Sequence, residues 1–217
     1  MPGFPSRVLF KAVARIPRVD ALKIDGDLSD WTDIPALPAL AELDGTDSFA
    51  RIHVAWSDAG LYVAEYCDKP VGTVSVNRRS PLAGDGLQLW IDTRGTQTTH
   101  RATRFCHHFV LLPKGGGLGR QEPLAWQGNI RRARERAPLC EPSEIRLASR
   151  VGPDHYTLEA FLAAGILNGF EPRAGLRMGF NYMAHDVPGG RQLWSTPPGF
   201  PADWDPSLWG LLELADG

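Results

Sequence analysis

Three aspartates stand around the first tryptophan of the chain, in the segment IDGDLSDW at residues 24–31. Asp25, Asp27 and Asp30 carry the hard carboxylate oxygens that calcium takes as ligands, although the same oxygens can accept hydrogen bonds from the backbone N–H groups of a turn. Trp31 has the large apolar area typical of a core residue. The segment therefore predicts an acidic turn that delivers a buried tryptophan, with calcium binding as the alternative use of its carboxylates.

A polar and aromatic pair stands in the segment DGLQLWIDT at residues 85–93. Side chains of a β-strand alternate between its two faces. Leu87, Leu89 and Ile91 therefore share one face, which we expect to be the buried one. Gln88 and Trp90 share the opposite face, where an amide that donates and accepts hydrogen bonds lies beside a large aromatic ring.

The residue types that usually carry catalysis are present but poorly spaced for it. His107 and His108 are adjacent, so on a strand they point to opposite faces and cannot bind one ion together. A distributed metal site from His53, His107 and His185 would need three strands to converge. A carboxylate pair for glycoside cleavage depends on tertiary distance, and the candidates to inspect are Glu65, Asp92 and Glu159. We expect no enzyme, and a hydrolase or redox carrier is the least favoured class.

Composition limits the partners. The chain has 217 residues, of which 43% are hydrophobic and 22% charged, with a formal net charge of −2. This balance is that of a folded globular protein and gives no general field for nucleic acid, although RRARER at 131–136 is locally basic. No apolar stretch approaches the length of a membrane helix, and we see no signal peptide. The three cysteines fit no disulfide framework, so we expect reduced thiols and a cytoplasmic protein.

The elements that must position these residues are predicted to be strands almost everywhere. Alternating and β-branched segments are separated by turns rich in proline and glycine, which is typical of a sandwich of two antiparallel sheets. We expect one domain over residues 1–217 and one short helical turn near 163–168. KGGGLG at 114–119 is expected to be a hairpin tip. The expected strands are 49–57, 61–68, 85–93, 104–112, 128–136, 144–151, 155–162, 176–186, 191–195 and 207–214.

Several segments taken in order resemble a known family. IDGDLSDW (24–31) is followed by ARIHVAWSDAGLYVAEYCDKP (50–70), GDGLQLWIDT (84–93), YTLEAFLAAGI (156–166) and GLRMGFNYMAHD (175–186), and the chain closes with DWDPSLWGLLEL (203–214). The series resembles the family 9 carbohydrate-binding modules and the wider group of DOMON-like sandwiches over residues 20–214. The resemblance implies an all-β sandwich fold and a non-catalytic module that binds a saccharide.

The resemblance also implies where a ligand would lie. Related modules hold a sugar on a concave sheet face, because tryptophan rings stack on the apolar faces of the sugar and polar side chains pair with its hydroxyls. The residues that the resemblance places there are Gln88, Trp90, His107, Phe109, Asn181 and Trp204, and alternation leaves open whether His108 and Val110 replace His107 and Phe109. Structural calcium in related modules implies a role for Asp25, Asp27 and Asp30.

This chain departs from the family pattern at two positions. Leu82 stands where one of the two stacking tryptophans is expected, and Gln88 stands in place of a glutamate. The alternative hypothesis is therefore a structural or protein-interaction domain whose sugar cleft has degenerated. Coplanar exposed aromatics would favour a sugar, whereas a flat apolar or arginine-rich patch would favour a protein partner.

Overall fold

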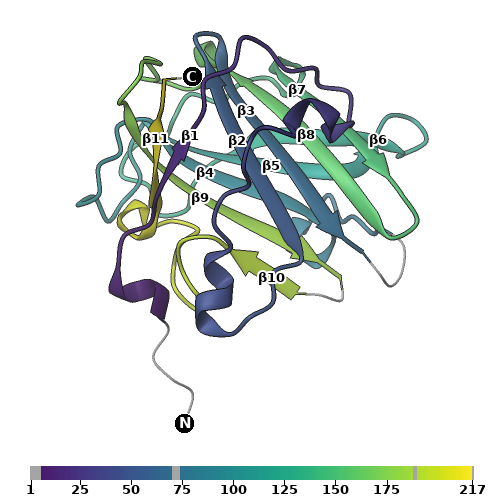
Figure 1. Cartoon of the computed structure of the whole chain (residues 1–217), viewed down its shortest axis with the longest axis horizontal. Helices are drawn as coiled ribbons and strands as arrows, with labels where there is room; N and C mark the ends of the chain where they lie inside the picture. The colour runs from purple at the N-terminus through teal and green to yellow at the C-terminus, as the bar shows by residue number, and fades with distance from the viewer. Residues whose placement is uncertain (1–5, 70–73, 188–189, 217) are drawn as a thin grey trace.

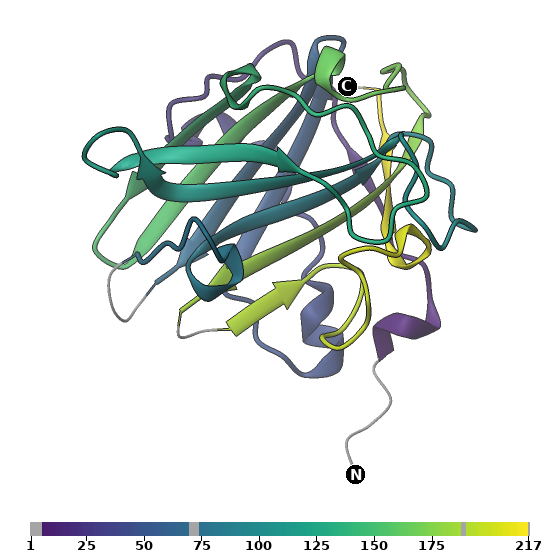
Figure 2. The same cartoon turned by 180° about the vertical axis from the view of Figure 1, so that it is seen from behind.

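The structure, a computed structural model, describes residues 6–69, 74–187 and 190–216 (Figure 1). Its strands form two sheets that pack face to face as a β-sandwich. The smaller sheet, in front in Figure 1, has the order β2 (Ala50–Ser57), β3 (Gly60–Asp68), β8 (His155–Ala163) and β7 (Ile145–Val151). The larger sheet, in front in Figure 2, has the order β1 (Val13–Ile16), β11 (Gly210–Leu214), β9 (Arg177–Asp186), β4 (Gly86–Asp92), β5 (Cys106–Gly116) and β6 (Glu122–Gly128), with β10 (Gly190–Leu193) paired to β9.

Alternate residues of the strands fill the space between the sheets. On β4, the side chains of Leu87, Leu89 and Ile91 are all at most 1% exposed and belong to the core, as the alternation of the sequence predicts. The same cluster of buried side chains runs from Ala14 near the start of the chain to Leu214 near its end. Both sheets therefore share one hydrophobic core.

The turn between β2 and β3 requires a glycine. Gly60 has a φ of 153°, and a Cβ atom there would collide with the carbonyl oxygen of Leu162 on the neighbouring strand β8. Only a residue without a side chain lets the three strands approach this closely. The hairpin that the sequence predicts here is confirmed, with Ser57 paired to Gly60.

The sandwich is antiparallel except at one edge. β1 pairs with β11 in the parallel direction, from Val13 beside Leu211 to Ile16 beside Leu214. The predicted helical turn is confirmed at η6 (Ala164–Ile166). The described residues hold six further 3-10 turns, which are η1 (Ser6–Leu9), η2 (Leu28–Trp31), η3 (Leu40–Asp44), η4 (Pro81–Ala83), η5 (Pro142–Glu144) and η7 (Pro206–Leu208).

The prediction of a strand at 128–136 is wrong. β6 comes earlier, at Glu122–Gly128, where it completes the hairpin with β5 around the glycine-rich tip. Beyond it, residues 129–136 form a loop in which Arg132 has a φ of 56°. Arginines fill this stretch where a strand would need apolar residues for the core, so it forms a loop instead.

The outer face of the smaller sheet is covered by residues 17–37, which cross in front of the strands in Figure 1. Trp31 is 2% exposed, as expected, and packs on this face against Ala55 and Phe161. His53 is half-buried, and its Nδ1 lies 2.7 Å from the carbonyl oxygen of Ile34. This segment therefore buries the outer face over β2, β3 and β8, whereas β7 stays partly exposed. No helix in the described ranges has the length and apolar character needed to cross a bilayer.

Candidate functional site

The outer face of the larger sheet carries an aromatic and polar platform. Trp90 on β4 stacks on His108 of β5, with ring centroids 4.8 Å apart and planes 7° apart. His108 Nε2 lies 2.8 Å from Gln88 Oε1, so the amide fixes the imidazole over the indole. Burial lowers the pKa of His108 to about 4, against the opposing charge of Asp203. The imidazole is therefore uncharged at neutral pH.

A pocket of about 430 Å³ opens beside this platform. Leu82 of η4 lines one side and Trp204 of the 198–204 loop lines another. Met183 and Leu193, which belong to the same apolar cluster as Trp90, also line it, and Met183 is the cross-strand neighbour of Gln88. The remaining lining residues are Arg131, Arg191, Pro198, Gly199, Phe200, Pro201 and Asp203. Figure 2 shows this face, with η4 and the 198–204 loop on either side of β10.

Trp204 is held in place from two sides. The guanidinium of Arg132 lies over its ring, 4.9 Å from the centroid, and Arg131 forms a 2.7 Å ion pair with Asp203. The loop itself is anchored because the buried Trp209 donates a hydrogen bond from Nε1 to the carbonyl oxygen of Ala202 at 2.7 Å. Trp204 therefore presents a half-buried, oriented ring to the pocket.

Two buried donors lie side by side in this platform. Trp90 and Asn181 are cross-strand neighbours, and both are at most 2% exposed. Asn181 Oδ1 accepts hydrogen bonds from Ser195 N at 3.1 Å and Ser195 Oγ at 3.0 Å. Asn181 Nδ2 and Trp90 Nε1 have no hydrogen-bond partner within the described part of the chain. Buried donors of this kind are normally paired, so the platform has hydrogen-bonding capacity that the neighbouring side chains do not use.

Comparison with known proteins supports the fold. No protein-family model matches the chain, and no curated protein sequence matches it. A family 9 carbohydrate-binding module from Caldicellulosiruptor kristjanssonii in complex with cellotriose is 18% identical, with a TM-score of 0.67, and the match covers 94% of this chain and 95% of that one. A family 9 module from the same organism in complex with glucose is 16% identical, with a TM-score of 0.68 and coverages of 95% and 97%. The chain has the family 9 fold.

A third match widens the comparison. A protein from Bacteroides uniformis, whose name proposes carbohydrate binding, is 11% identical, with a TM-score of 0.59, and the match covers 94% of this chain and all of that one. The TM-scores and coverages establish the shared sandwich fold. Because the identities are low, the ligand of this chain has to be argued from its own residues.

Two predicted ligand contacts are wrong. His107 and Phe109 are fully buried, on the face of β5 that points into the sandwich. His107 Nδ1 lies 3.0 Å from Gln127 Nε2, and its ring stacks on Phe109. The register of the β4–β5 hairpin pairs Trp90 with His108, so His108 and not His107 shares the outer face of the family 9 sheet. That register was the missing signal, because alternation within β5 alone cannot say which face is inside.

The other predicted contacts fall in two layers. Of the predicted ligand contacts, Trp204 lines the pocket directly. Gln88, Trp90 and Asn181 lie on the outer face as expected but are at most 6% exposed, so they form the platform rather than an open surface. The sequence reasoning missed the lining residues Met183, Leu193 and Phe200, whose apolar side chains read as ordinary core, and Arg131, which lay in the wrongly predicted strand.

The acidic turn does not gather its carboxylates around one point. Arg150 forms a 2.7 Å ion pair with Asp27 and lies 3.7 Å from Asp25, while Asp30 accepts from the backbone N–H of Lys23 at 3.4 Å. Hydrogen bonds from Ser29 and Arg150 lower the pKa of Asp27. The described residues contain no group of three histidine, cysteine or acidic side chains that could hold a metal. In this arrangement the carboxylates contact an arginine and a backbone donor, and calcium binding stays a prediction.

The acidic turn instead docks on Glu159. This carboxylate of β8 accepts hydrogen bonds from Asp25 N at 3.0 Å, Gly26 N at 2.5 Å and Trp31 Nε1 at 2.6 Å. Glu159 therefore acts as a structural anchor. Glu65 points into the sandwich core, and Asp92 accepts from the backbone of Arg94 and Thr96, so the three inspected carboxylates serve separate places.

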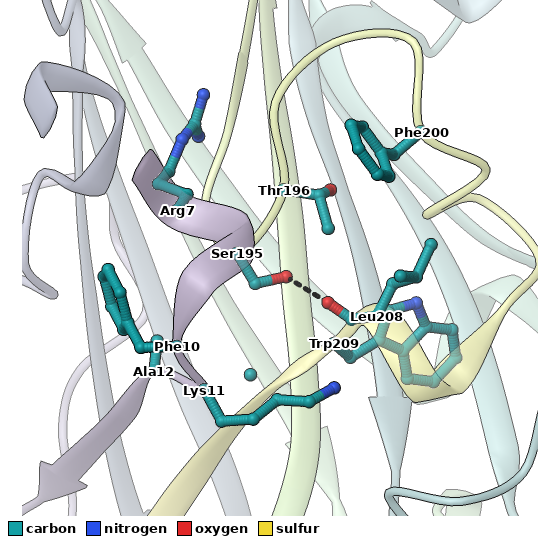
Figure 3. Close-up of a pocket in the computed structure, with 10 residues that line it drawn as sticks. Arg7, Phe10, Lys11, Ala12, Ser195, Thr196, Phe200, Leu208 and Trp209 are labelled. Carbon is teal, nitrogen blue, oxygen red and sulfur yellow. Dashed lines mark hydrogen bonds between the residues drawn. The ribbon is translucent and has the colours of Figure 1, made fainter. Parts of the chain in front are cut away.

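A second, smaller pocket of about 210 Å³ lies at the edge of the larger sheet (Figure 3). Phe10 and Lys11 line it from the N-terminal segment, and Ser195, Leu208 and Trp209 line it from the C-terminal part. Ser195 Oγ donates to the carbonyl oxygen of Leu208 at 2.9 Å, so its hydroxyl is already committed. Thr196 Oγ1, which also lines this pocket, has no hydrogen-bond partner within the described residues.

Proposed function

We propose that the chain is a non-catalytic saccharide-binding module whose ligand lies in the pocket between Leu82 and Trp204. The observation that carries the proposal is the pairing of an oriented tryptophan wall with an uncharged polar platform. A sugar ring is apolar on its faces and polar at its rim, so it needs an aromatic surface and hydrogen-bonding groups more than charge. The family 9 modules that share the fold were solved with cellotriose and glucose, which supports this ligand class.

Leu82 leaves the pocket with one tryptophan where two would sandwich a sugar. The leucine is 39% exposed and lines the pocket at the position where the family resemblance places a tryptophan. Phe200, also 39% exposed, is the other aromatic residue of the lining. We therefore expect weaker and less selective binding than a double tryptophan clamp would give.

Isothermal titration calorimetry with glucose and cellotriose tests the proposal. We expect Trp204→Ala to weaken binding at least about tenfold, because the stacking surface is lost. Trp204→Phe should retain most of the affinity. Trp126→Ala is the matched control, since it removes a half-buried tryptophan from β6 of the same sheet, outside the pocket lining. Binding that Trp204→Ala leaves unchanged, or wild-type protein that binds neither sugar, would contradict the proposal.

A protein-interaction role is the second candidate, and one observation favours it. Leu9, Phe10 and Val13 are 74%, 46% and 47% exposed, beside the edge strand β1. Apolar side chains gathered at a sheet edge are a feature of interaction surfaces. Sedimentation of the wild type and of Leu9→Ser with Phe10→Ser would test self-association through this edge, and a monomer in both cases would remove that support.

A further inference from the structure

An arginine-lined pocket of about 600 Å³ lies next to η4 on the other side from Trp204. One wall is the segment 76–79 and the other is the turn between β5 and β6. Its lining residues are Val76, Asn77, Arg78, Arg79, Gly115 and Arg120. Half of these residues carry a guanidinium group and none carries a carboxylate.

The first wall is fixed by the backbone and not left as a free loop. Ser75 and Asp85 exchange two hydrogen bonds, from Asp85 N to Ser75 O and from Ser75 N to Asp85 Oδ2, both at 2.6 Å. Asn77 Oδ1 then accepts from Arg79 N at 3.1 Å and Ser80 N at 2.9 Å, which closes an Asx turn. The backbone that carries Arg78 and Arg79 is therefore held in one conformation.

The second wall meets the first at Gly115. A Cβ atom built at this glycine would lie 3.5 Å from Cγ of Arg78, so the aliphatic stem of Arg78 rests on the hairpin backbone. Arg120 lies on the same turn with a φ of 54°, and its carbonyl oxygen accepts from Gly115 N at 3.0 Å. These contacts bring Arg78 and Arg120 to one concavity from positions 42 residues apart in the sequence.

The three arginines have no carboxylate of their own. Arg78, Arg79 and Arg120 form no ion pair with any residue in the described ranges. The nearest acidic group on the hairpin is Glu122, which packs against Gly117. What distinguishes these three guanidinium groups is that they line one concavity with no carboxylate in its lining. The planar guanidinium matches carboxylate, sulfate and phosphate groups with two parallel hydrogen bonds.

The arginine-lined pocket and the Trp204 pocket share one segment. Arg79 lines the first and Leu82 lines the second, and three residues span at most about 10 Å. Arg131 and Arg191 line the Trp204 pocket, and the one carboxylate there, Asp203, is paired with Arg131. The two pockets therefore adjoin along η4, so one short oligosaccharide could occupy both.

We propose, on the basis of the proposed saccharide function, that the ligand is an acidic saccharide whose anionic substituent binds Arg78, Arg79 and Arg120. The shared chemistry is a carboxylate or a sulfate on a sugar ring. The lining of the arginine pocket contains no aromatic ring on which a nucleic-acid base could stack, which favours a saccharide over single-stranded nucleic acid.

Paired neutral and charged ligands test the inference on the whole chain by calorimetry. Trigalacturonate and its methyl ester form the carboxylate pair, and sulfated and unmodified cellotriose form the sulfate pair. We expect the charged member of at least one pair to bind about tenfold more tightly at low salt, and this advantage to shrink in 0.5 M salt. The double variant R78Q/R120Q should remove the advantage and leave the neutral member unchanged. The double variant R134Q/R173Q is the charge-matched control, because both arginines are exposed and lie outside both pockets.

The outcomes separate this inference from the function on which it rests. Equal affinity for charged and neutral ligands, both lost in Trp204→Ala, would overturn the acidic ligand and keep saccharide binding. Wild-type protein that binds none of the four saccharides would overturn both. A thymidine oligonucleotide that binds more tightly than either acidic trisaccharide, through the same arginines, would overturn the saccharide assignment for this pocket.

Discussion

The two outer faces of the sandwich treat their tryptophans differently. On the smaller sheet, Trp31 is covered by its own segment and donates to Glu159 at 2.6 Å. On the larger sheet, Trp90 is just as buried, but its Nε1 has no hydrogen-bond partner in the described ranges and an open pocket lies beside it. The same side chain thus closes one outer face, whereas on the other it lies beside a pocket with its donor unused. Buried donors are normally paired, so this difference is the reason to propose a ligand on the larger sheet.

The largest effect is expected in the core that both faces share. Glu65 is fully buried, and burial together with the charge of Asp85 raises its pKa to about 8. The folded state therefore holds a proton on Glu65 that the unfolded state releases near pH 4.5, so the free energy of unfolding falls as pH rises from about 4.5 to 8. We expect this loss to be on the order of 4 kcal/mol.

Urea unfolding of the wild type and Glu65→Gln across this pH range measures that loss. The variant should unfold with a flatter pH profile because its amide does not titrate. Equal slopes for the two proteins would show that Glu65 is not the titrating group. Glu65 lies in the core and does not line the Trp204 pocket, so saccharide affinity should change little in the folded variant below pH 6.

Removing the Glu159 anchor from the closed face should cause the next largest loss in the free energy of unfolding. Glu159→Ala leaves three donors of the acidic turn without their acceptor, and we expect the free energy of unfolding to fall by roughly 3 kcal/mol. Glu159→Gln keeps one acceptor oxygen and should lose about half as much. Chemical denaturation gives both values, and sugar binding by the surviving folded protein should be unchanged. A loss in Glu159→Ala below about 0.5 kcal/mol would contradict the anchoring role.

On the open face, we expect the pocket wall and the buried platform to differ in their effect on stability. Trp204 is half-buried on a loop, so we expect Trp204→Ala to lower the free energy of unfolding by only about 1 kcal/mol while it removes saccharide affinity. Trp90→Ala removes a 2% exposed ring and should destabilise the fold by about 3–5 kcal/mol. Similar losses for both variants would erase the distinction between the platform and the wall.

The smallest expected effect sharpens the comparison. Leu82→Trp would supply a second tryptophan to the Trp204 pocket, and one added aromatic contact predicts about a two- to tenfold gain in saccharide affinity. Leu139→Trp adds the same surface at an exposed leucine outside the Trp204 pocket and serves as the control. No gain in Leu82→Trp over Leu139→Trp would mean that η4 does not face the bound ring.

The sequence could predict whatever depended on local periodicity. Alternation in β4 correctly separates Leu87, Leu89 and Ile91 from Gln88 and Trp90. The ordered segments around them predict the family 9 sandwich, which the solved structures support.

The predictions that failed depended on strand register and on the course of loops. The hairpin register decides between His107 and His108, and alternation within one strand carries no information about it. The basic loop after β6 contributes Arg131 to the pocket only because the loop is folded back over the sheet, where it pairs with Asp203. The two unused donors became visible only when Trp90 and Asn181 were placed side by side.

The parallel pair of β1 and β11 has a mechanical consequence. Because the two strands run in the same direction, the chain enters β1 at one end of the ladder and leaves β11 at the other, as Figure 1 shows. A force that pulls on the two sides of this pair loads its hydrogen bonds together in shear instead of opening them one by one. The four residue pairs from Val13 to Ile16 would therefore have to break together, and not one after another, when the two ends of the described chain are pulled apart.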